Sequence, residues 1–476
     1  MDRRPLRCVQ AGILPVPQSA RQSFFRPFAV PGSGKWLEPE LPIGILNGLD
    51  VIEARSKSGA LDVALSAAGV RRAPSPPRLC AGMAVQFAVG GAVIPFVTLF
   101  FRDRGLDFGQ ISLIFTASSA TLLVFPFLWG MLADRVVPLN RLFIVLNLLS
   151  CAALALLGQA RSFPAILVAY TCFFACFNPT LYLMNALCFH HLADPREQFG
   201  IVRAWGSLGW IVPFLPISLW LARGGDGDLG FVLYVGMACA LLMTGLSFWL
   251  PHTPPGGQPA AHPSDTSAAR RGGGAYRKAI RELLLDSNYI VLLISMFLMA
   301  GSFSLLTYYS PPLLQDIGVP RPWIGPIQAI GVVFEIVLFQ WQPALIRRWS
   351  FVAVILTGCV ALSLRHLLFG LVGNAWILSA SYLLAGMVIV FYNQGVSILV
   401  NAMAAREVRA TAQTLLLLFG QGLGPLFANG VTGRVAAHTG NRLTPVFLFA
   451  AALAILASLL ISVRAGHLNQ AGRDAE

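Results

Sequence analysis

The chain alternates long apolar runs with short polar loops from Leu79 to near its C-terminal end. Each run spans roughly twenty residues or more, enough to cross about 30 Å of hydrocarbon as an α-helix. We expect twelve spans, near 79–101, 108–133, 139–160, 163–190, 199–222, 229–250, 287–315, 321–346, 350–373, 375–402, 408–434 and 443–464. Barrel strands would alternate with a period of two, but these runs are continuous. The pattern therefore predicts an all-α membrane protein with twelve transmembrane helices.

Residues 1–78 form an N-terminal extension that differs in kind from the rest. The segment mixes Pro, Gly, Ser and Arg, and its Arg-rich, acid-poor start resembles an organelle transit peptide. It has no apolar core of a secretory signal and nothing that would build a packed core. We favour either a disordered cytoplasmic tail or a start codon assigned too far upstream.

A second break falls between the sixth and seventh spans. Residues 251–286 begin with a Pro-, Gly- and Ser-rich stretch without apolar periodicity, which is typical of a flexible linker. The linker ends in a short basic helix, Tyr276 to Leu285, expected on the inner membrane surface. It divides the chain into two six-helix halves, 79–250 and 287–465, followed by a C-terminal tail, 466–476. This layout is that of transporters that rock around a midplane site.

Composition narrows the class of protein. Hydrophobic residues make up 56% of the chain and charged residues 12%, against about 25% charge in soluble domains, which excludes a cytosolic enzyme. The net charge of +13 comes largely from alternate loops, as the positive-inside rule requires if both termini are cytoplasmic. The excess charge therefore sets topology and does not indicate a nucleic-acid partner. The simplest location is a bacterial inner membrane, and we expect a monomer.

Sequence signals for metals, cofactors and catalysis are weak. Most of the eight cysteines lie in or beside the spans, where cysteine acts as a small apolar residue. Cys172 and Cys176 lie one turn apart, but a zinc site usually has four ligands. No Walker loop, nucleophile elbow or HExxH motif occurs. We expect no metal, no cofactor and no enzyme activity.

The loop after the second span carries a charged motif. Residues 130–135 read GMLADR and are followed by the basic Arg141. The motif resembles the G-x-L-A-D-R signature of the major facilitator superfamily. In physical terms, Asp134 can pair with Arg135, with Arg141 or with a neighbouring helix N-terminus, and so latch one access state. The resemblance implies a gating role for Gly130, Asp134, Arg135 and Arg141; an ordinary charged turn is the alternative.

A longer match lies at the start of the fifth span. Residues 199–210 read FGIVRAWGSLGW, similar to a segment of the lactose permease, phenylpropionate permease and nucleoside proton symporter group. The sequence EVR at 407–409 and Arg365 extend the resemblance, which covers roughly residues 79–465 and implies the major facilitator fold. In lactose permease the residues matching Arg203 and Trp210 bind sugar hydroxyls and stack on the sugar ring.

Arg203 and Trp210 also suit a binding site by their chemistry. They are seven residues apart and so share one face of a helix. A guanidinium supplies donors for hydroxyls or a carboxylate, and an indole supplies a stacking surface. Alternatively, Arg203 is a membrane anchor that extends to the interface and Trp210 packs against lipid or protein.

Other positions depart from the relatives. The acid expected on the fourth span falls at Asn185, which keeps hydrogen bonding but loses the charge. The histidine and acid expected on the tenth span fall near Ala385 and Val388. This span offers Tyr392 and Asn393 instead. We therefore add Asn185, Tyr392 and Asn393 to the candidate binding residues, without the lactose permease proton relay.

Glu335 is the one carboxylate well inside an apolar run, and an ionisable residue at membrane depth is by default a functional candidate. Arg365 lies at a similar depth of the next span, so the two could pair. An unpaired buried glutamate stays protonated, whereas a nearby arginine favours its ionised form. A substrate that separates them would couple binding to proton release; a permanent structural ion pair is the alternative.

Together these observations predict a secondary transporter that moves a small ring-bearing polar solute (a sugar, nucleoside or aromatic acid) with protons. Efflux of amphipathic compounds by proton antiport is the nearest rival, since the chain has 32 Phe residues. A transporter-like receptor without turnover is another, because acids of the relatives are missing at Asn185 and near Val388.

Overall fold

The computed structural model describes residues 76–224, 229–255, 273–405 and 408–473. The chain separates into two units, Met1–Arg71 and Arg72–Glu476. The expected N-terminal extension falls almost entirely outside the described residues, and so does the central part of the linker. All that follows concerns the second unit.

The twelve expected spans are confirmed, and most of their ends agree to within a few residues. The helices of the first half are α3 (Pro77–Val93), α4 (Val97–Asp103), α5 (Phe108–Thr121), α6 (Phe125–Arg135), α7 (Leu139–Gln159), α8 (Phe163–His191), α9 (Pro195–Ile211), α10 (Phe214–Arg223) and α11 (Gly230–Ser247). Three spans are each built from two consecutive helices: α3 with α4, α5 with α6, and α9 with α10.

The helices of the second half are more irregular, and its tenth and eleventh spans are each divided into several segments. They are α14 (Ser287–Asp316), α15 (Arg321–Trp349), α16 (Phe351–Leu371), α17 (Ala375–Ala380), η3 (Ser381–Leu384), α18 (Ala385–Met387), η4 (Val388–Gln394), α19 (Gly395–Met403), α20 (Arg409–Leu417), η6 (Leu418–Leu423), α21 (Gly424–His438) and α22 (Thr444–Val463). The expected linker helix is present as α13 (Gly273–Leu285), and the tail forms a further helix, α23 (Ala465–Arg473).

Proline explains some of the interruptions. Pro95 lies between α3 and α4, and Pro213 lies between α9 and α10, where the missing N–H and the ring break the helical hydrogen bonds. Pro311 and Pro312, in contrast, lie inside α14, and the helix continues through both. Neighbouring spans can support a helix around proline in a membrane protein.

Close backbone contact fixes the first half around α3 and α9. A Cβ atom at Gly209 would overlap the backbone of Ala84, and one at Gly91 would overlap the backbone of Trp210. Small residues allow such approach between membrane helices. Gly206 and Gly209 of the motif at 199–210 therefore allow α9 to pack against α3, and this contact fixes where Arg203 and Trp210 lie.

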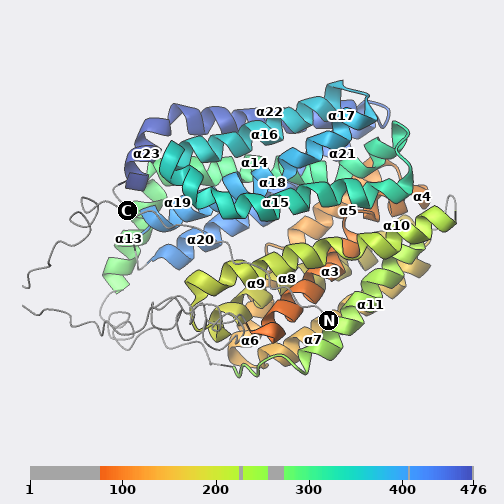
Figure 1. Ribbon diagram of the computed structural model, residues 1–476, viewed down its shortest axis with the longest axis horizontal. Coiled ribbons are helices and arrows are strands. Elements are labelled where there is room, and N and C mark those ends of the chain that lie inside the picture. The colour runs from red at the N-terminus through yellow and green to blue at the C-terminus, as the bar shows by residue number, and fades with distance from the viewer. Residues whose placement is uncertain (1–75, 225–228, 256–272, 406–407, 474–476) are drawn as a thin grey trace, which may run out of the picture. The chain divides into compact units, whose positions relative to one another are not determined.

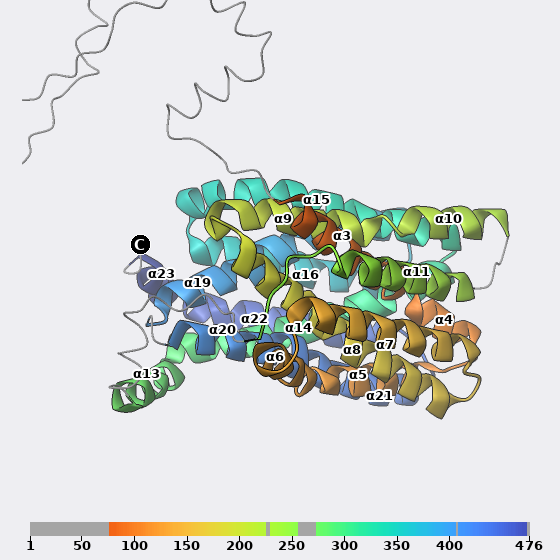
Figure 2. The ribbon, with the colours of Figure 1, turned by 90° about the horizontal axis from the view of Figure 1, so that it is seen from below.

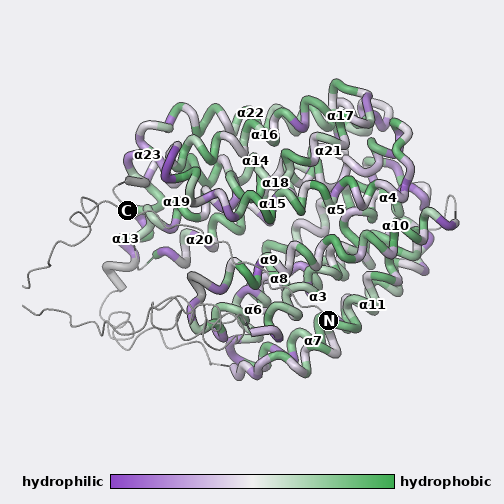
Figure 3. The backbone as a smooth tube through the Cα atoms, in the orientation of Figure 1, coloured by the Kyte–Doolittle hydropathy of each residue, from purple (hydrophilic) through white to green (hydrophobic). Residues whose placement is uncertain are grey.

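The two halves gather on opposite sides of the molecule in Figure 1, with α3–α11 on one side and α14–α22 on the other. Figure 2 shows α15 of the second half running beside α9 and α10 of the first, as their direct contacts also require. Hydrophobic residues line the spans in Figure 3, and hydrophilic residues concentrate at both helix ends. The positive-inside rule predicts that the end carrying α13 and α23 is cytoplasmic, and the other end is called the outer end below.

Ion pairs join the halves at the opposite, outer end. Arg102 donates to Asp316 at 2.7 Å, and Arg321 donates to both carboxylate oxygens of Asp103, at 2.7 and 3.0 Å. Each pair links the end of the first span to the seventh or eighth span. The charged residues at the outer ends therefore hold the two halves together.

Candidate functional site

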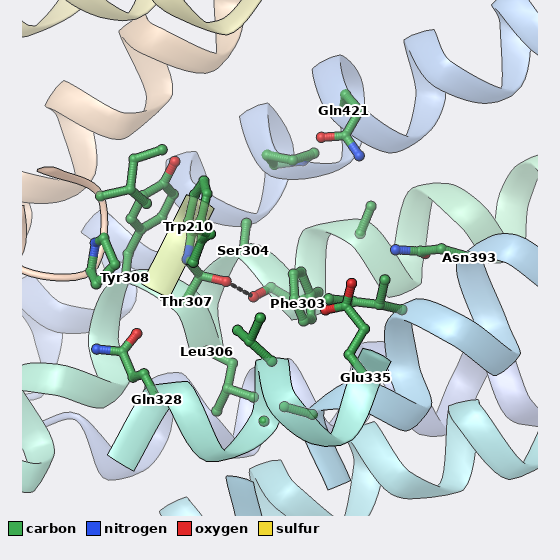
Figure 4. A pocket seen from close by; sticks show the side chains of 18 of the residues that line it. Trp210, Phe303, Ser304, Leu306, Thr307, Tyr308, Gln328, Glu335, Asn393 and Gln421 are labelled. Carbon is green, nitrogen blue, oxygen red and sulfur yellow. Dashed lines mark hydrogen bonds between the residues drawn. The ribbon is translucent and has the colours of Figure 1, made fainter. Parts of the chain in front are cut away.

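A cavity of about 410 Å³ lies where the halves face each other, with lining residues from both. Its polar lining comes from Ser119, Asn178, Arg203, Ser207, Trp210, Ser304, Thr307, Tyr308, Ser310, Gln328, Glu335, Arg365, Tyr382, Asn393 and Gln421. Figure 4 shows Glu335 and Asn393 toward one side, and Tyr308 and Gln328 toward the other. The volume fits a small ring-bearing solute.

Glu335 is the only acidic residue among those lining the cavity, and only 4% of it is exposed. The Ser207 hydroxyl donates to Glu335 Oε1 at 3.2 Å, and the Arg203 guanidinium donates to that hydroxyl at 3.2 Å. Arg203 and Ser207 lie on α9, whereas Glu335 lies on α15. A buried network therefore joins the halves through one carboxylate, one hydroxyl and one guanidinium.

Aromatic rings border this network on the first half. The Arg203 guanidinium lies 4.5 Å from the centroid of the Phe87 ring, which provides a cation–π contact. Trp210 lines the same cavity from α9, and its ring packs over Gly90. The structure thus brings Arg203 and Trp210 to one cavity with Glu335.

The expected ion pair between Glu335 and Arg365 is not formed in this structure. Arg365 forms no ion pair with any described residue; its guanidinium lies 4.5 Å from the centroid of the Tyr382 ring. The backbone of Glu335 instead packs tightly against Gly386 of α18. Equal depth on successive spans does not make two residues partners, because α15 packs against the tenth span as well as the ninth.

Two of the expected binding residues lie outside the cavity. Tyr392 is fully buried, and its hydroxyl donates to Ser295 at 3.0 Å, so it bridges η4 and α14. Asn185 does not line the cavity, whereas Asn178 does. Seven residues correspond to about 10 Å along a helix, so Asn185 lies too close to the cytoplasmic end.

Asn393 does line the cavity, from a π-helical segment. Both η4 and η6 are π-helices, and they supply Ile389, Asn393, Gly420 and Gln421 to the lining. A π-helical turn changes the phase of the side chains and is frequent at functional sites. Asn393 of η4 thus lies at the cavity, while the adjacent Tyr392 is fixed in the packing.

The cytoplasmic motif is not engaged as a latch. Asp134, Arg135 and Arg141 are exposed, and none forms an ion pair in the part of the chain that the structure describes. A Cβ atom at Gly130 would meet nothing within 4 Å. The gating role implied by the resemblance therefore stays a prediction for another conformation.

Aromatic residues from both halves pack together beside the cavity. The ring of Phe115 stacks on Tyr308 with centroids 3.8 Å apart and planes 13° apart. The Ser112 hydroxyl donates to the backbone carbonyl of Asn429 nearby. Tyr308 also lines the cavity, so this stack is a contact between the halves at the edge of the site.

Several site residues were missed from the sequence. Ser207 lies inside the recognised motif but was not assigned a role, and nothing in the sequence distinguished Ser310 or Tyr382. Other polar residues at span depth divide between lining the cavity and bridging helices. Gln328 and Gln421 line the cavity, whereas Gln86 bridges helices by donating to Thr180 at 2.6 Å.

A family model described as the MFS_1 like family matches residues 78–449. The chain belongs to this family. The major facilitator fold expected from its motifs is thereby confirmed, and the chain is a multi-pass secondary transporter of the cell membrane.

Named relatives agree with this assignment. The chain is 24% identical over 399 residues to the maltose permease of Geobacillus stearothermophilus, covering 82% of this chain and 94% of that protein. It is 22% identical over 360 residues to the nucleoside permease NupG of Escherichia coli (strain K12), covering 73% and 84%. The crystal structure of the nucleoside transporter NupG matches with a TM-score of 0.68 at 19% identity, over 81% of this chain and 98% of that chain.

Proposed function

We propose that this transporter moves a small polar, ring-bearing solute by proton-coupled symport. The observation that carries the proposal is the single carboxylate of the cavity: Glu335 is 4% exposed and connects through Ser207 to Arg203 on the opposite half. When a carboxylate in this position gains or loses a proton, its contact with the opposite half changes at the same time. The residues that we assign to proton coupling are therefore Glu335, Ser207 and Arg203.

The coupling follows from what each form of Glu335 can do. The ionised carboxylate accepts from Ser207 and is attracted by Arg203, which holds α9 and α15 together. The protonated form is neutral and can donate to a solute oxygen instead. A solute that accepts hydrogen bonds from Arg203 or Ser207 would replace the interactions of the ionised Glu335 with these residues. The proton on Glu335 would replace the interactions that the carboxylate loses. Solute and proton would therefore be carried together.

The solute class is proposed from the lining and from the relatives. Trp210 provides a stacking surface, and Asn178, Gln328, Asn393 and Gln421 provide amide groups for hydroxyls or ring heteroatoms. Two relatives are named as a maltose permease and a nucleoside permease, so their named solutes are a sugar and nucleosides. We propose these two solute classes and add aromatic acids as a third. Because one chain supplies the whole cavity, we propose that the monomer is the functional unit.

Uptake into proteoliposomes with a lumenal pH probe tests the proposal, using sugars, nucleosides and aromatic acids. We expect one class to acidify the lumen as it enters. Glu335→Gln should lose this acidification and accumulation against a gradient, yet retain solute exchange, because exchange needs no net proton movement. Glu282→Gln, a matched change on the exposed surface of α13, should behave as the parent protein.

Three other results would point elsewhere. Solute uptake without a proton signal would make the protein a facilitator. Solute-driven alkalinisation of the lumen would indicate antiport and therefore efflux. Binding without flux for every solute would indicate a receptor.

A further inference from the structure

The charges that line the cavity do not balance. Arg203 and Arg365 contribute two guanidinium groups, and Glu335 contributes the only carboxylate. The hydrogen bonds through Ser207 assign that carboxylate to Arg203. Arg365 is left with no acidic partner among the described residues.

Arg365 is also buried deeply enough for this imbalance to matter. It is 2% exposed, and its Nε and Nη2 atoms have no hydrogen-bond partner. A buried cation without a counter-charge is costly, so such groups are normally paired. The counter-charge is missing from the described part of the chain, while the side chain lines a cavity large enough for a solute.

The surroundings of Arg365 hold the guanidinium in place. Its central carbon lies 4.5 Å from the ring centroid of Tyr382, and the hydroxyl of Tyr382 is hydrogen-bonded to Ser310 at 2.8 Å. All three residues line the cavity. A guanidinium that lies over an aromatic ring can still offer N–H groups at its edge to a planar anion.

We propose that Arg365, supported by Tyr382 and Ser310, is an anion-binding subsite, and that the transported solute carries a carboxylate or phosphate group beside its ring. The proposal rests on the proposed function and narrows its solute class to anions. The anion binds Arg365 from the second half, and the ring lies against Trp210 of the first half. Arg365 is therefore a specificity residue, separate from the coupling network of Glu335.

Equilibrium binding to the purified full-length protein in nanodiscs at pH 7.5 tests the subsite with a matched pair of probes. 4-Hydroxybenzoate carries a carboxylate, and 4-hydroxybenzamide is its neutral analogue of nearly the same shape. We expect the parent protein to prefer the carboxylate by roughly 30-fold or more, the range for removal of one partner of a buried charge pair. Phenyl phosphate in a third arm distinguishes a phosphate site from a carboxylate site.

Variants assign the preference to Arg365. Arg365→Gln should abolish it, Arg365→Lys should retain part of it, and the surface control Arg277→Gln should leave it unchanged. Thermal melting of each variant separates a lost subsite from a lost fold, and Arg365→Lys keeps the test valid if Arg365→Gln does not fold.

The outcomes also separate this inference from the transport function. Anion preference that depends on Arg365 without uptake in proteoliposomes would support the subsite and contradict transport. Equal binding of the probes, or tighter binding of uridine and maltose that Arg365→Gln leaves unchanged, would overturn the subsite and leave transport standing. Absence of binding by every probe to folded parent protein would also overturn it.

Discussion

At the outer ends of the spans, Arg102 and Arg321 join the two halves by pairing with Asp316 and Asp103. At the cytoplasmic ends, Asp134 and its neighbouring arginines are exposed and form no ion pair with any residue that the structure describes. Both ends therefore carry acids and arginines, but among the described residues the ion pairs between the halves lie at the outer end. From this difference we infer that this conformation is closed on the outer side.

The strength of the outer contacts suits a reversible closure. The side chains of Arg321 and Asp103 are 15% and 31% exposed, and those of Arg102 and Asp316 are 34% and 41% exposed. Partly exposed ion pairs contribute about 1 kcal/mol or less each. The predicted latch at Asp134 would replace such contacts at little net cost in free energy, as alternating access requires.

The largest effect is expected when the two halves are cross-linked at their outer ends. Ser112 Cβ lies 3.3 Å from where a Cβ at Gly433 would be, close to the value of about 3.8 Å in disulfides. We expect oxidised Ser112→Cys/Gly433→Cys protein to lose uptake almost completely and to regain it on reduction. Each single variant under the same oxidant is the control. Uptake at the parental rate by fully cross-linked protein would show that the outer ends need not separate.

A smaller effect is expected at the cytoplasmic end. Asp134→Asn should leave solute affinity and thermal stability unchanged in the present conformation, where Asp134 has no ion-pair partner. It should slow uptake by about fivefold, which corresponds to about 1 kcal/mol for the removal of one ion pair from the opposite state. Glu282→Gln serves as the surface control. If Asp134→Asn lowered stability while uptake stayed normal, the latch would belong to this conformation.

The smallest expected effect concerns the outer ion pairs themselves. Arg321→Gln should increase labelling of a cysteine at the cavity residue Ser119 by an impermeant maleimide from outside, by roughly two- to fivefold. Arg102→Gln should have less effect, because its pair is more exposed. The charge swap Asp103→Arg/Arg321→Asp should restore slow labelling. Unchanged labelling in Arg321→Gln would leave the closure to the Phe115 and Tyr308 stack.

The fold could be predicted from hydropathy because each span has to be long and apolar, whatever its neighbours. The site depended on which helices pack together, and hydropathy does not specify that. Glu335 and Arg203 were identifiable as a charge at membrane depth and as part of a motif. Their connection through Ser207 was not, because it joins the fifth span to the eighth across the two halves.

Local irregularities account for most of the remaining differences. The π-helical turn at η4 places Asn393 at the cavity and Tyr392 in the packing, whereas an alignment of spans treats the two alike. The position of the acid in the relatives predicted Asn185 as the binding residue of the fourth span. In the structure Asn178 lines the cavity and Asn185 does not. We propose a role for Arg365 because no acid among the described residues pairs with it. Only the packed structure reveals this.

The most direct test of the account is the distance across each end of the transporter, measured by double electron–electron resonance in a cysteine-free background. Spin labels at Arg161 and Trp376 report the outer end, and labels at Val136 and Trp349 report the cytoplasmic end. Alternating access predicts a short outer distance and a long cytoplasmic distance without solute. When solute and a proton gradient are present, it predicts a second population with the reverse pattern. One unchanging distribution at both ends, with solute bound, would contradict alternating access and indicate a receptor.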